Sequence, residues 1–254
     1  MTHDFTPFAE RYGWPVLGRR YPYCIGHRGA SGHMTENTLA AFELASELGA
    51  EMWELDTQLS KDGVVMVSHD DHLERVFGKN LQISQLTAAD LREAVPDVPT
   101  FAEVAALGRR LGTGLYVELK APGSGLKCWR ELLLHDQRFA SLGSFDTAQV
   151  RELRDAGCDY PLSVLVRVGN DPFALGDRAG ADVLHLCWER AGDRPQDLVT
   201  PALLHRAFAR GLEIVLWHEE RPSILDDISA LPVLGICTDL PDLMRPAVRQ
   251  AAVT

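Results

Sequence analysis

The stretch that decides the fold runs from Cys24 to Asp71 and reads CIGHRGASGHMTENTLAAFELASELGAEMWELDTQLSKDGVVMVSHDD. It holds three clusters of reactive side chains: His27-Arg28-Gly29, Glu54-Leu55-Asp56 and His69-Asp70. Each cluster lies at the end of an apolar run or inside one. This placement predicts a catalytic rim built at the ends of β-strands.

Outward from this stretch, apolar runs typical of strands alternate with amphipathic segments typical of helices. Strand-like runs are expected at 23–26, 52–59, 64–68, 115–119, 140–144, 161–168, 183–188, 212–217 and 235–238. Helices are expected from a cap at Thr35, Glu36 or Asn37 to Gly49, and near 87–94, 100–111, 126–135, 146–156, 172–179, 200–210, 224–230 and 240–251. Such alternation favours a parallel sheet with right-handed crossovers. About eight strands favour an α/β fold closed as a TIM (β/α)8 barrel.

The chain of 254 residues fits one such barrel. We predict a single domain over 1–254, with the barrel core at 22–251 and a small insertion at 71–99 after the third strand-like run. Residues 1–21 are aromatic and punctuated by Pro and Gly, which predicts an irregular arm. The first strand is followed by neither a Gly-x-Gly-x-x-Gly motif nor a Walker loop, which disfavours nucleotide binding.

The net charge of −11 predicts an acidic surface that repels nucleic acid and anionic membranes. We therefore expect no nucleic-acid partner, and no apolar run is long enough to predict an integral membrane segment. The N-terminus lacks the apolar region of a signal peptide, and the five cysteines are widely spaced without a CxxC pair. These features predict a cytoplasmic protein, and no pattern indicates an oligomeric state.

Pairs of charged residues, two positions apart, mark two of the expected strands. Glu54 and Asp56 are two residues apart and therefore point to the same side of a strand, as do Glu118 and Lys120 on a later strand. A single pair of this kind usually means only that charged residues at the end of a strand face water. Two such pairs make this explanation less convincing. Three carboxylates at the carboxyl ends of barrel strands suit one divalent cation, Mg²⁺ or Ca²⁺, because both prefer oxygen ligands.

Histidines and cations complete the candidate site. His27 and His69 directly follow strand ends, and histidine can take and give a proton near neutral pH. His185 and His218 lie at late strands and are expected either at the mouth of the barrel or in structural roles. A divalent cation, Arg28 and Lys120 together would exceed the charge of the three carboxylates by one positive charge. This excess would balance the single negative charge of a phosphodiester. The site is therefore expected to depend strictly on metal.

At these residues the sequence resembles the glycerophosphodiester phosphodiesterase family. The resemblance rests on the motifs GHRGAS at 26–31, ENT at 36–38, ELD at 54–56, HD at 69–70, VELK at 117–120, SFD at 144–146, Trp217, and TD and PD at 238–239 and 241–242. It implies a TIM barrel and metal-dependent cleavage of glycerophosphodiesters to glycerol 3-phosphate and an alcohol.

The resemblance also implies a role for each matching residue. Glu54, Asp56 and Glu118 would bind the metal, and His27 and His69 would form the acid–base pair, with His27 favoured as the base. Substrate contacts would come from Arg28, Lys120 and Trp217. The nucleophile would be either water or the substrate's own 2-hydroxyl, through a cyclic phosphate.

The chain departs from the family's pattern at the substrate rim. Thr35 replaces a proline, the segment 72–78 lacks the usual threonines, and His218-Glu219-Glu220 follows Trp217. Three alternatives therefore remain: a lysophospholipase D, a phospholipase C-like phosphodiesterase, and a non-catalytic barrel that binds glycerophosphodiesters. A lipid substrate would favour an exposed apolar lip at Leu73, Val76 and Phe77, although these residues fit the core of the insertion equally well.

Overall fold

Strands and helices alternate along the chain in the computed structural model, which describes residues 2–18 and 21–245. The strands are β1 (Tyr23–His27), β2 (Met52–Leu59), β3 (Val65–Val67), β4 (Gly114–Leu119), β5 (Ala140–Ser144), β6 (Leu162–Arg167), β7 (Val183–Cys187), β8 (Glu213–His218) and β9 (Gly235–Thr238). The helices are α1 (Thr6–Tyr12), α2 (Leu39–Glu47), α3 (Glu74–Phe77), α4 (Ala88–Ala94), α5 (Phe101–Leu111), α6 (Ser124–Leu134), α7 (Thr147–Asp155), α8 (Pro172–Ala179), α9 (Pro201–Phe208), α10 (Pro222–Ser229) and α11 (Pro241–Met244). This order confirms the predicted alternation.

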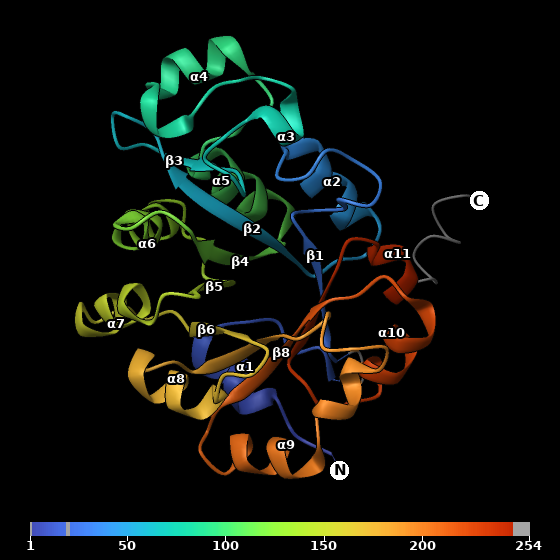
Figure 1. The fold of residues 1–254 in the computed structure, drawn as a ribbon. Helices are drawn as coiled ribbons and strands as arrows, with labels where there is room; N and C mark the ends of the chain where they lie inside the picture. The colour runs from blue at the N-terminus through green and yellow to red at the C-terminus, as the bar shows by residue number, and fades with distance from the viewer. Residues whose placement is uncertain (1, 19–20, 246–254) are drawn as a thin grey trace.

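The sheet closes into a barrel because β1 pairs in parallel with both β2 and β9 (Figure 1). The remaining neighbours, from β4 round to β9, are parallel as well, which confirms the predicted TIM barrel. The third strand-like run is the exception. β3 pairs antiparallel with the end of β2 and lies outside the ring, so it begins the excursion instead of continuing the barrel.

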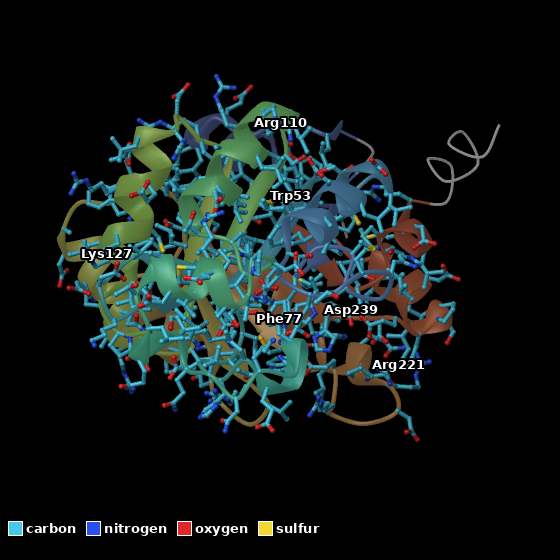
Figure 2. The ribbon with its side chains drawn as sticks, turned by 90° about the horizontal axis from the view of Figure 1, so that it is seen from above. Trp53, Phe77, Arg110, Lys127, Arg221 and Asp239 are labelled. Atoms are coloured by element: carbon cyan, nitrogen blue, oxygen red, sulfur yellow. The ribbon has the colours of Figure 1, made fainter. Side chains whose placement is uncertain are left out.

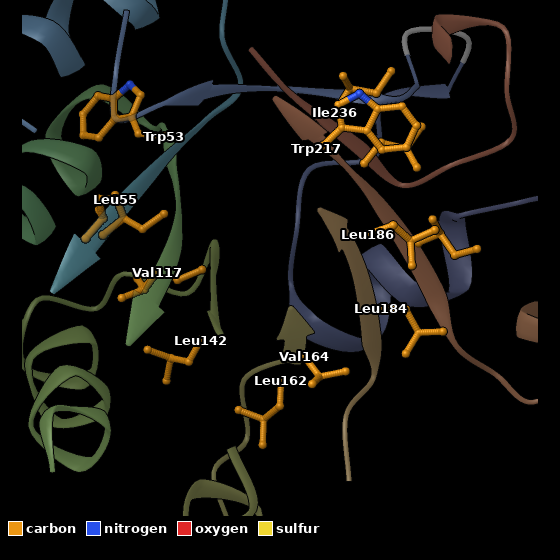
Figure 3. Packing of buried hydrophobic residues seen from close by; sticks show 14 of the residues in the cluster. Trp53, Leu55, Val117, Leu142, Leu162, Val164, Leu184, Leu186, Trp217 and Ile236 are labelled. Carbon is orange, nitrogen blue, oxygen red and sulfur yellow. The ribbon is translucent and has the colours of Figure 1, made fainter. Parts of the chain in front are cut away.

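Alternate residues of the strands face two different environments. One set packs against the surrounding helices, as Figure 3 shows for Trp53, Leu55, Val117, Leu184 and others. The other set packs in a separate cluster inside the barrel, formed by Tyr23, Ile25, Met52, Tyr116, Phe139, Val183, Val215, Leu234 and Cys237. Since Glu54 and Asp56 alternate with Trp53 and Leu55, their carboxylates share the inner side with Met52.

The prediction of an irregular N-terminal arm is wrong in part, because residues 6–12 form helix α1. Pro7 lies in its first turn and Gly13 caps its C-terminus with φ of 70°, an arrangement that favours a helix start and stop. Phe8 and Trp14 are buried in the same cluster as the inner residues of the barrel, and Trp14 contacts Tyr23 at the start of β1 edge to face. The arm therefore closes the amino-terminal end of the barrel.

The insertion at 71–99 is organised around a small core of its own. Leu73, Ile83, Leu91, Val95 and Val98 pack with one another and against Met66 of β3. The expected helix at 87–94 is confirmed as α4, with a capping box formed by Thr87 and Asp90. Seen from above, α3 with Phe77 lies in front of the barrel (Figure 2).

Most helix boundaries agree with the sequence, and Thr100 and Glu103 form the expected capping box of α5. The start of α2 differs, because Thr38 is its N-cap instead of one of the three residues before it. Asn37 is unavailable as a cap since its side chain turns inward to Asp56. The expected last helix at 240–251 is described only as α11, and 246–254 lie outside the described residues.

Within the part of the chain that the structure describes, no helix combines the length and the apolar character needed to span a membrane. The five cysteines are free thiols, and all but Cys187 are buried.

Candidate active site

The polar groups predicted to form a site lie at the carboxyl ends of neighbouring barrel strands. His27 at the end of β1 stands in register with Glu54 on β2, and Asp56 stands in register with Glu118 on β4. Parallel strands meet with their carboxyl ends at one edge, so the register brings these side chains together. The predicted grouping of the three acids is observed.

Glu54, Asp56 and Glu118 each offer a carboxylate oxygen, and these oxygens lie within 4.8 Å of one another. All three residues are buried. Burial and the neighbouring Asp56 raise the pKa of Glu118 to about 7 and the pKa of Glu54 well above its usual value. Crowding of this kind indicates a cation site, because buried acids repel one another unless positive charge lies between them.

Asp56 supports the fit of a cation to these residues. Its Oδ2 accepts a hydrogen bond from Asn37 Nδ2 at 2.9 Å, whereas its buried Oδ1 accepts no hydrogen bond among the described residues and is compensated only by the Lys120 ammonium 3.2 Å away. A buried carboxylate oxygen without a hydrogen bond is costly in an isolated protein. The set of three oxygen donors suits a hard divalent cation and does not suit soft metals.

Two cations flank the acids. Lys120 Nζ lies 2.8 Å from Glu118 Oε1 and 3.2 Å from Asp56 Oδ1. Arg28 Nε lies 3.2 Å from Asp56 Oδ2, and the Arg28 backbone N–H donates to Glu54 Oε2 at 3.1 Å. Burial alone would lower the pKa values of both cations, but the acids beside them raise these pKa values, so both remain charged.

A tight turn places Arg28. Its φ is 54°, and the following Gly29 has φ of 86°. A Cβ at Gly29 would lie 2.6 Å from the backbone carbon of Ala41, so glycine is required where this turn meets α2. The GHRG sequence is therefore a backbone requirement as well as a source of reactive groups.

His27 is held between residues on, or just beyond, the two strands that flank β1. Its Nδ1 lies 2.6 Å from Asp239 Oδ1, just beyond β9, and its Nε2 lies 3.8 Å from Glu54 Oε2. Its ring stacks on His218, with centroids 4.4 Å apart and planes at 3°. Burial lowers the pKa of His27, although the hydrogen bond that its ring donates to Asp239 opposes that shift. A neutral ring held by a carboxylate is the usual state of a general base.

His69, in the loop between β3 and α3, has a carboxylate partner as His27 does. Its Nδ1 lies 2.6 Å from Asp70 Oδ1. The other oxygen of Asp70 accepts a hydrogen bond from Arg75 Nε at 2.6 Å, and Arg75 also donates to Glu36. Each histidine therefore has one ring nitrogen held by an aspartate, which leaves the other for chemistry.

His27, His69 and two of the three acids, Glu54 and Glu118, line one pocket of about 260 Å³. The remaining lining residues are Arg28, Lys120, Phe145, Leu165, His185, Cys187, Glu189, Arg190, Trp217, His218 and Cys237. His185 and His218 both line this pocket, but His185 is 5% exposed and packs against Tyr116 inside the barrel, so the expected place at the mouth does not hold for His185. Trp217 belongs to the wall, but its indole is buried and donates to Glu219 Oε2 at 3.1 Å, so little of its surface is open to a ligand.

Sequence reasoning did not identify several partners of the site. Asp239 and Asn37 are far along the chain from the site residues that they hold, whereas Arg75 is close in sequence to its partner Asp70. The motifs at 36–38 and 238–239 could have indicated Asn37 and Asp239, because polar residues beside a strand end or a turn often orient the reacting side chains. Arg75 had no such signal.

The comparisons with known proteins agree with this geometry. The family model described as the glycerophosphoryl diester phosphodiesterase family matches residues 27–243. A glycerophosphodiester phosphodiesterase of Caldanaerobacter subterraneus is 27% identical over 244 residues, which cover 89% of this chain and 97% of that protein. A human lysophospholipase D is 48% identical over 67 residues, which cover only 26% of this chain and 21% of that protein.

A solved structure has the same fold. It is an Oleispira antarctica phosphodiesterase in complex with the product sn-glycerol-3-phosphate, with a TM-score of 0.73, 20% identity, and coverage of 92% of this chain and 97% of that chain. The barrel and its pocket of acids and histidines define a phosphodiesterase of the TIM-barrel class. The chain belongs to the glycerophosphoryl diester phosphodiesterase family, and it is an enzyme.

Proposed function

We propose that this protein hydrolyses glycerophosphodiesters to glycerol 3-phosphate and an alcohol with the help of one divalent cation, Mg²⁺ or Ca²⁺. The observation that carries the proposal is a cluster of three buried carboxylates, two of which line one pocket together with two cations and two aspartate-held histidines. The Oleispira antarctica relative with bound sn-glycerol-3-phosphate supports the same reaction.

Each residue has a chemical task in this proposal. Glu54, Asp56 and Glu118 would hold the cation, which supplies positive charge to polarise the phosphoryl oxygens and stabilise the transition state. Arg28 and Lys120 would contact the phosphate oxygens, because they are the cations nearest the acids. Trp217 would contribute a wall of the pocket instead of a hydrogen bond to substrate.

The histidines would move the protons. His27, neutral and oriented by Asp239, would take a proton from the attacking hydroxyl at Nε2. His69, protonated on both ring nitrogens and held at Nδ1 by Asp70, would donate its Nε2 proton to the leaving alkoxide and become neutral. Proton transfer of this kind accelerates a reaction by about 10²- to 10⁴-fold.

The insertion favours a small polar alcohol over a long lipid chain. Leu73 is buried in the core of the insertion and Phe77 packs against the same core, so of the three candidates for an apolar lip only the half-buried Val76 lies outside that core. The lysophospholipase D relative matches too short a part of the chain to favour a lipid substrate. Glycerophosphocholine, glycerophosphoethanolamine and glycerophosphoinositol are therefore the substrates to test first.

The dependence on metal is the central test of this function. We expect hydrolysis to fall to background after thorough chelation and to return on addition of Mg²⁺ or Ca²⁺, because without a cation the acids repel a phosphodiester. The measurement is glycerol 3-phosphate release from each candidate substrate. Hydrolysis that survives chelation would contradict the proposal.

A matched pair of variants sharpens the test. Glu118→Gln keeps the size of the side chain and removes a metal ligand, so we expect metal affinity to fall by at least about 10-fold. Glu131→Gln on the outer helix α6 makes the same change at a half-buried position away from the pocket and should leave metal affinity unchanged.

We also propose a cytoplasmic location. Five free cysteines, most of them buried, are ordinary in a reducing compartment.

A further inference from the structure

Arg75 links the two halves of the site through one guanidinium group. Its Nε donates to Asp70 Oδ2 at 2.6 Å, while Nη1 and Nη2 donate to the two oxygens of Glu36 at 3.0 and 2.7 Å. Asp70 in turn holds His69, and Glu36 accepts a hydrogen bond from Arg28 Nη1 at 2.9 Å. A continuous chain of contacts thus runs from one proposed acid–base residue to one proposed phosphate cation.

The first half of this chain fixes the ring of His69. A carboxylate at Nδ1 holds a proton on that nitrogen and leaves Nε2 directed to other partners. Asp70 fixes the orientation of the His69 ring well only when a second contact restrains its other carboxylate oxygen. Arg75 fixes that oxygen, and with His69 it keeps the pKa of Asp70 low against the opposing effect of burial.

The second half fixes Arg28. The guanidinium of Arg28 lies between Glu36 on one side and Asp56 on the other. Because Arg75 binds both oxygens of Glu36, it limits the positions that this carboxylate can offer to Arg28. A planar guanidinium with its fork of donors suits this double task, whereas the single ammonium group of lysine cannot reproduce it.

Arg75 belongs to the insertion and not to the barrel. It lies on α3, whose start at Leu73 is anchored in the core formed with Met66, Ile83 and Leu91. The side chain itself is half exposed, so its ion pairs add little to the stability of the fold. Its contacts therefore matter for the position of the groups that it joins.

We propose that Arg75 is a positioning residue through which the insertion sets the geometry of both His69 and Arg28. This inference rests on the proposed phosphodiesterase function. It gives the segment 71–99 a part in catalysis in addition to its place beside the pocket.

The test compares Arg75→Gln, Arg75→Lys and the control Arg92→Gln, which removes an exposed arginine of the same insertion that pairs with Glu103. With glycerophosphocholine and saturating Mg²⁺, we expect Arg75→Gln to lower kcat/KM by about 10- to 100-fold. The loss should divide between a lower kcat, through His69, and a higher KM, through Arg28. Arg75→Lys should recover only part of it, and Arg92→Gln should match the wild type.

Two single variants separate the halves of the chain. Asp70→Asn should lower mainly kcat, and Glu36→Gln should raise mainly KM. When either variant is combined with Arg75→Gln, the fold-change in kcat/KM should be smaller than the product of the two separate fold-changes. The reason is that the paired residues act through one contact. Equal kinetics for Arg75→Gln and Arg92→Gln, full recovery in Arg75→Lys, or a kinetic loss that follows thermal unfolding would overturn the inference.

A measurement independent of turnover keeps this inference distinct from the proposed reaction. At a pH where the His69 ring is neutral, its ¹⁵N chemical shifts should show the tautomer with the proton on Nδ1 in the wild type and a mixture of tautomers in Arg75→Gln. The same tautomer in both proteins would count against the positioning role even if the enzyme acted on a different phosphodiester. If the tautomer changed between the wild type and Arg75→Gln but the wild type had no hydrolytic activity, only the proposed reaction would be refuted.

Discussion

At the scale of single residues, Asn37 shows how a side chain outside the reacting set can control it. Its Nδ2 donates to Asp56 Oδ2 at 2.9 Å, and its Oδ1 accepts the backbone N–H of Asp56 at 3.3 Å. Its φ of 57° lies in the left-handed region, which asparagine and glycine tolerate better than other residues. One residue thus orients a proposed metal ligand and also allows the turn before α2.

These two tasks predict different results for two substitutions. Asn37→Gly keeps the backbone conformation accessible but loses both hydrogen bonds, so we expect metal affinity to fall by about 10- to 100-fold. Asn37→Ala should show the same loss and should also unfold more readily, by about 1 kcal/mol, because alanine is strained at this φ. Isothermal titration with Mg²⁺ and chemical denaturation measure the two effects. Unchanged affinity in Asn37→Gly would contradict the role of the amide.

His185 makes the stability of the fold depend on pH. Burial, together with nearby His27 and His218, lowers the pKa of His185 to about 3, whereas the pKa in an unfolded chain is about 6.5. Below pH 6.5 the unfolded chain binds a proton that the folded protein does not bind until about pH 3. The contribution of His185 is therefore present above pH 6.5 and is lost as the pH falls through this window.

We expect this residue to add up to about 1.4 kcal/mol per pH unit to the slope of unfolding free energy against pH. His185→Gln removes the titrating ring, so its unfolding free energy should fall less steeply than that of the wild type between pH 6.5 and pH 4. Urea unfolding at a series of pH values measures the slopes. Identical slopes would show that the ring titrates alike in both states.

At the scale of elements, helix α1 and the segment after it stabilise the barrel from the end opposite to the pocket. Trp14 packs edge to face against Phe8, Tyr23 and Phe139, and only 4% of its surface is exposed. Removal of a buried indole costs about 3–5 kcal/mol. The segment is remote from the chemistry, so its contribution is to folding.

We therefore expect Trp14→Ala to lower the unfolding free energy by about 3–5 kcal/mol while kcat/KM of the folded protein stays at the wild-type value. Val16→Ala is the matched control, because Val16 lies in the same segment and is exposed. Denaturant unfolding and steady-state kinetics on the same samples measure the two effects. A large loss of activity in Trp14→Ala at temperatures where the variant is folded would contradict the claim that this segment contributes to stability and not to catalysis.

Elements also show what local sequence could predict. The helices α4 and α5 were predictable because their capping boxes are written within a few residues. α1 was not recognised because Pro7 and Gly13 signal loops as readily as helix ends. β3 was recognised as a strand, but its antiparallel pairing with β2 depends on the turn between them and on where the chain goes next.

At the scale of the whole molecule, the acids of the site were predictable for a simple physical reason. Residues two apart on a strand share a side, and parallel strands end at one edge, so Glu54, Asp56 and Glu118 had to meet once the barrel closed. The supporting residues follow no such rule. Asp239 reaches His27 only because β9 is the neighbour of β1, and the partners of Arg75 depend on how the insertion folds back.

The contact between His27 and Asp239 joins the first and last strands of the ring. During synthesis, a chain that has not yet produced β9 therefore holds every proposed metal ligand and both histidines, but one histidine lacks the carboxylate that orients it. The ring is also open at that stage, so the pocket has no wall on the side of β9. We therefore expect no hydrolytic activity from the nascent chain until the last strand has closed the barrel.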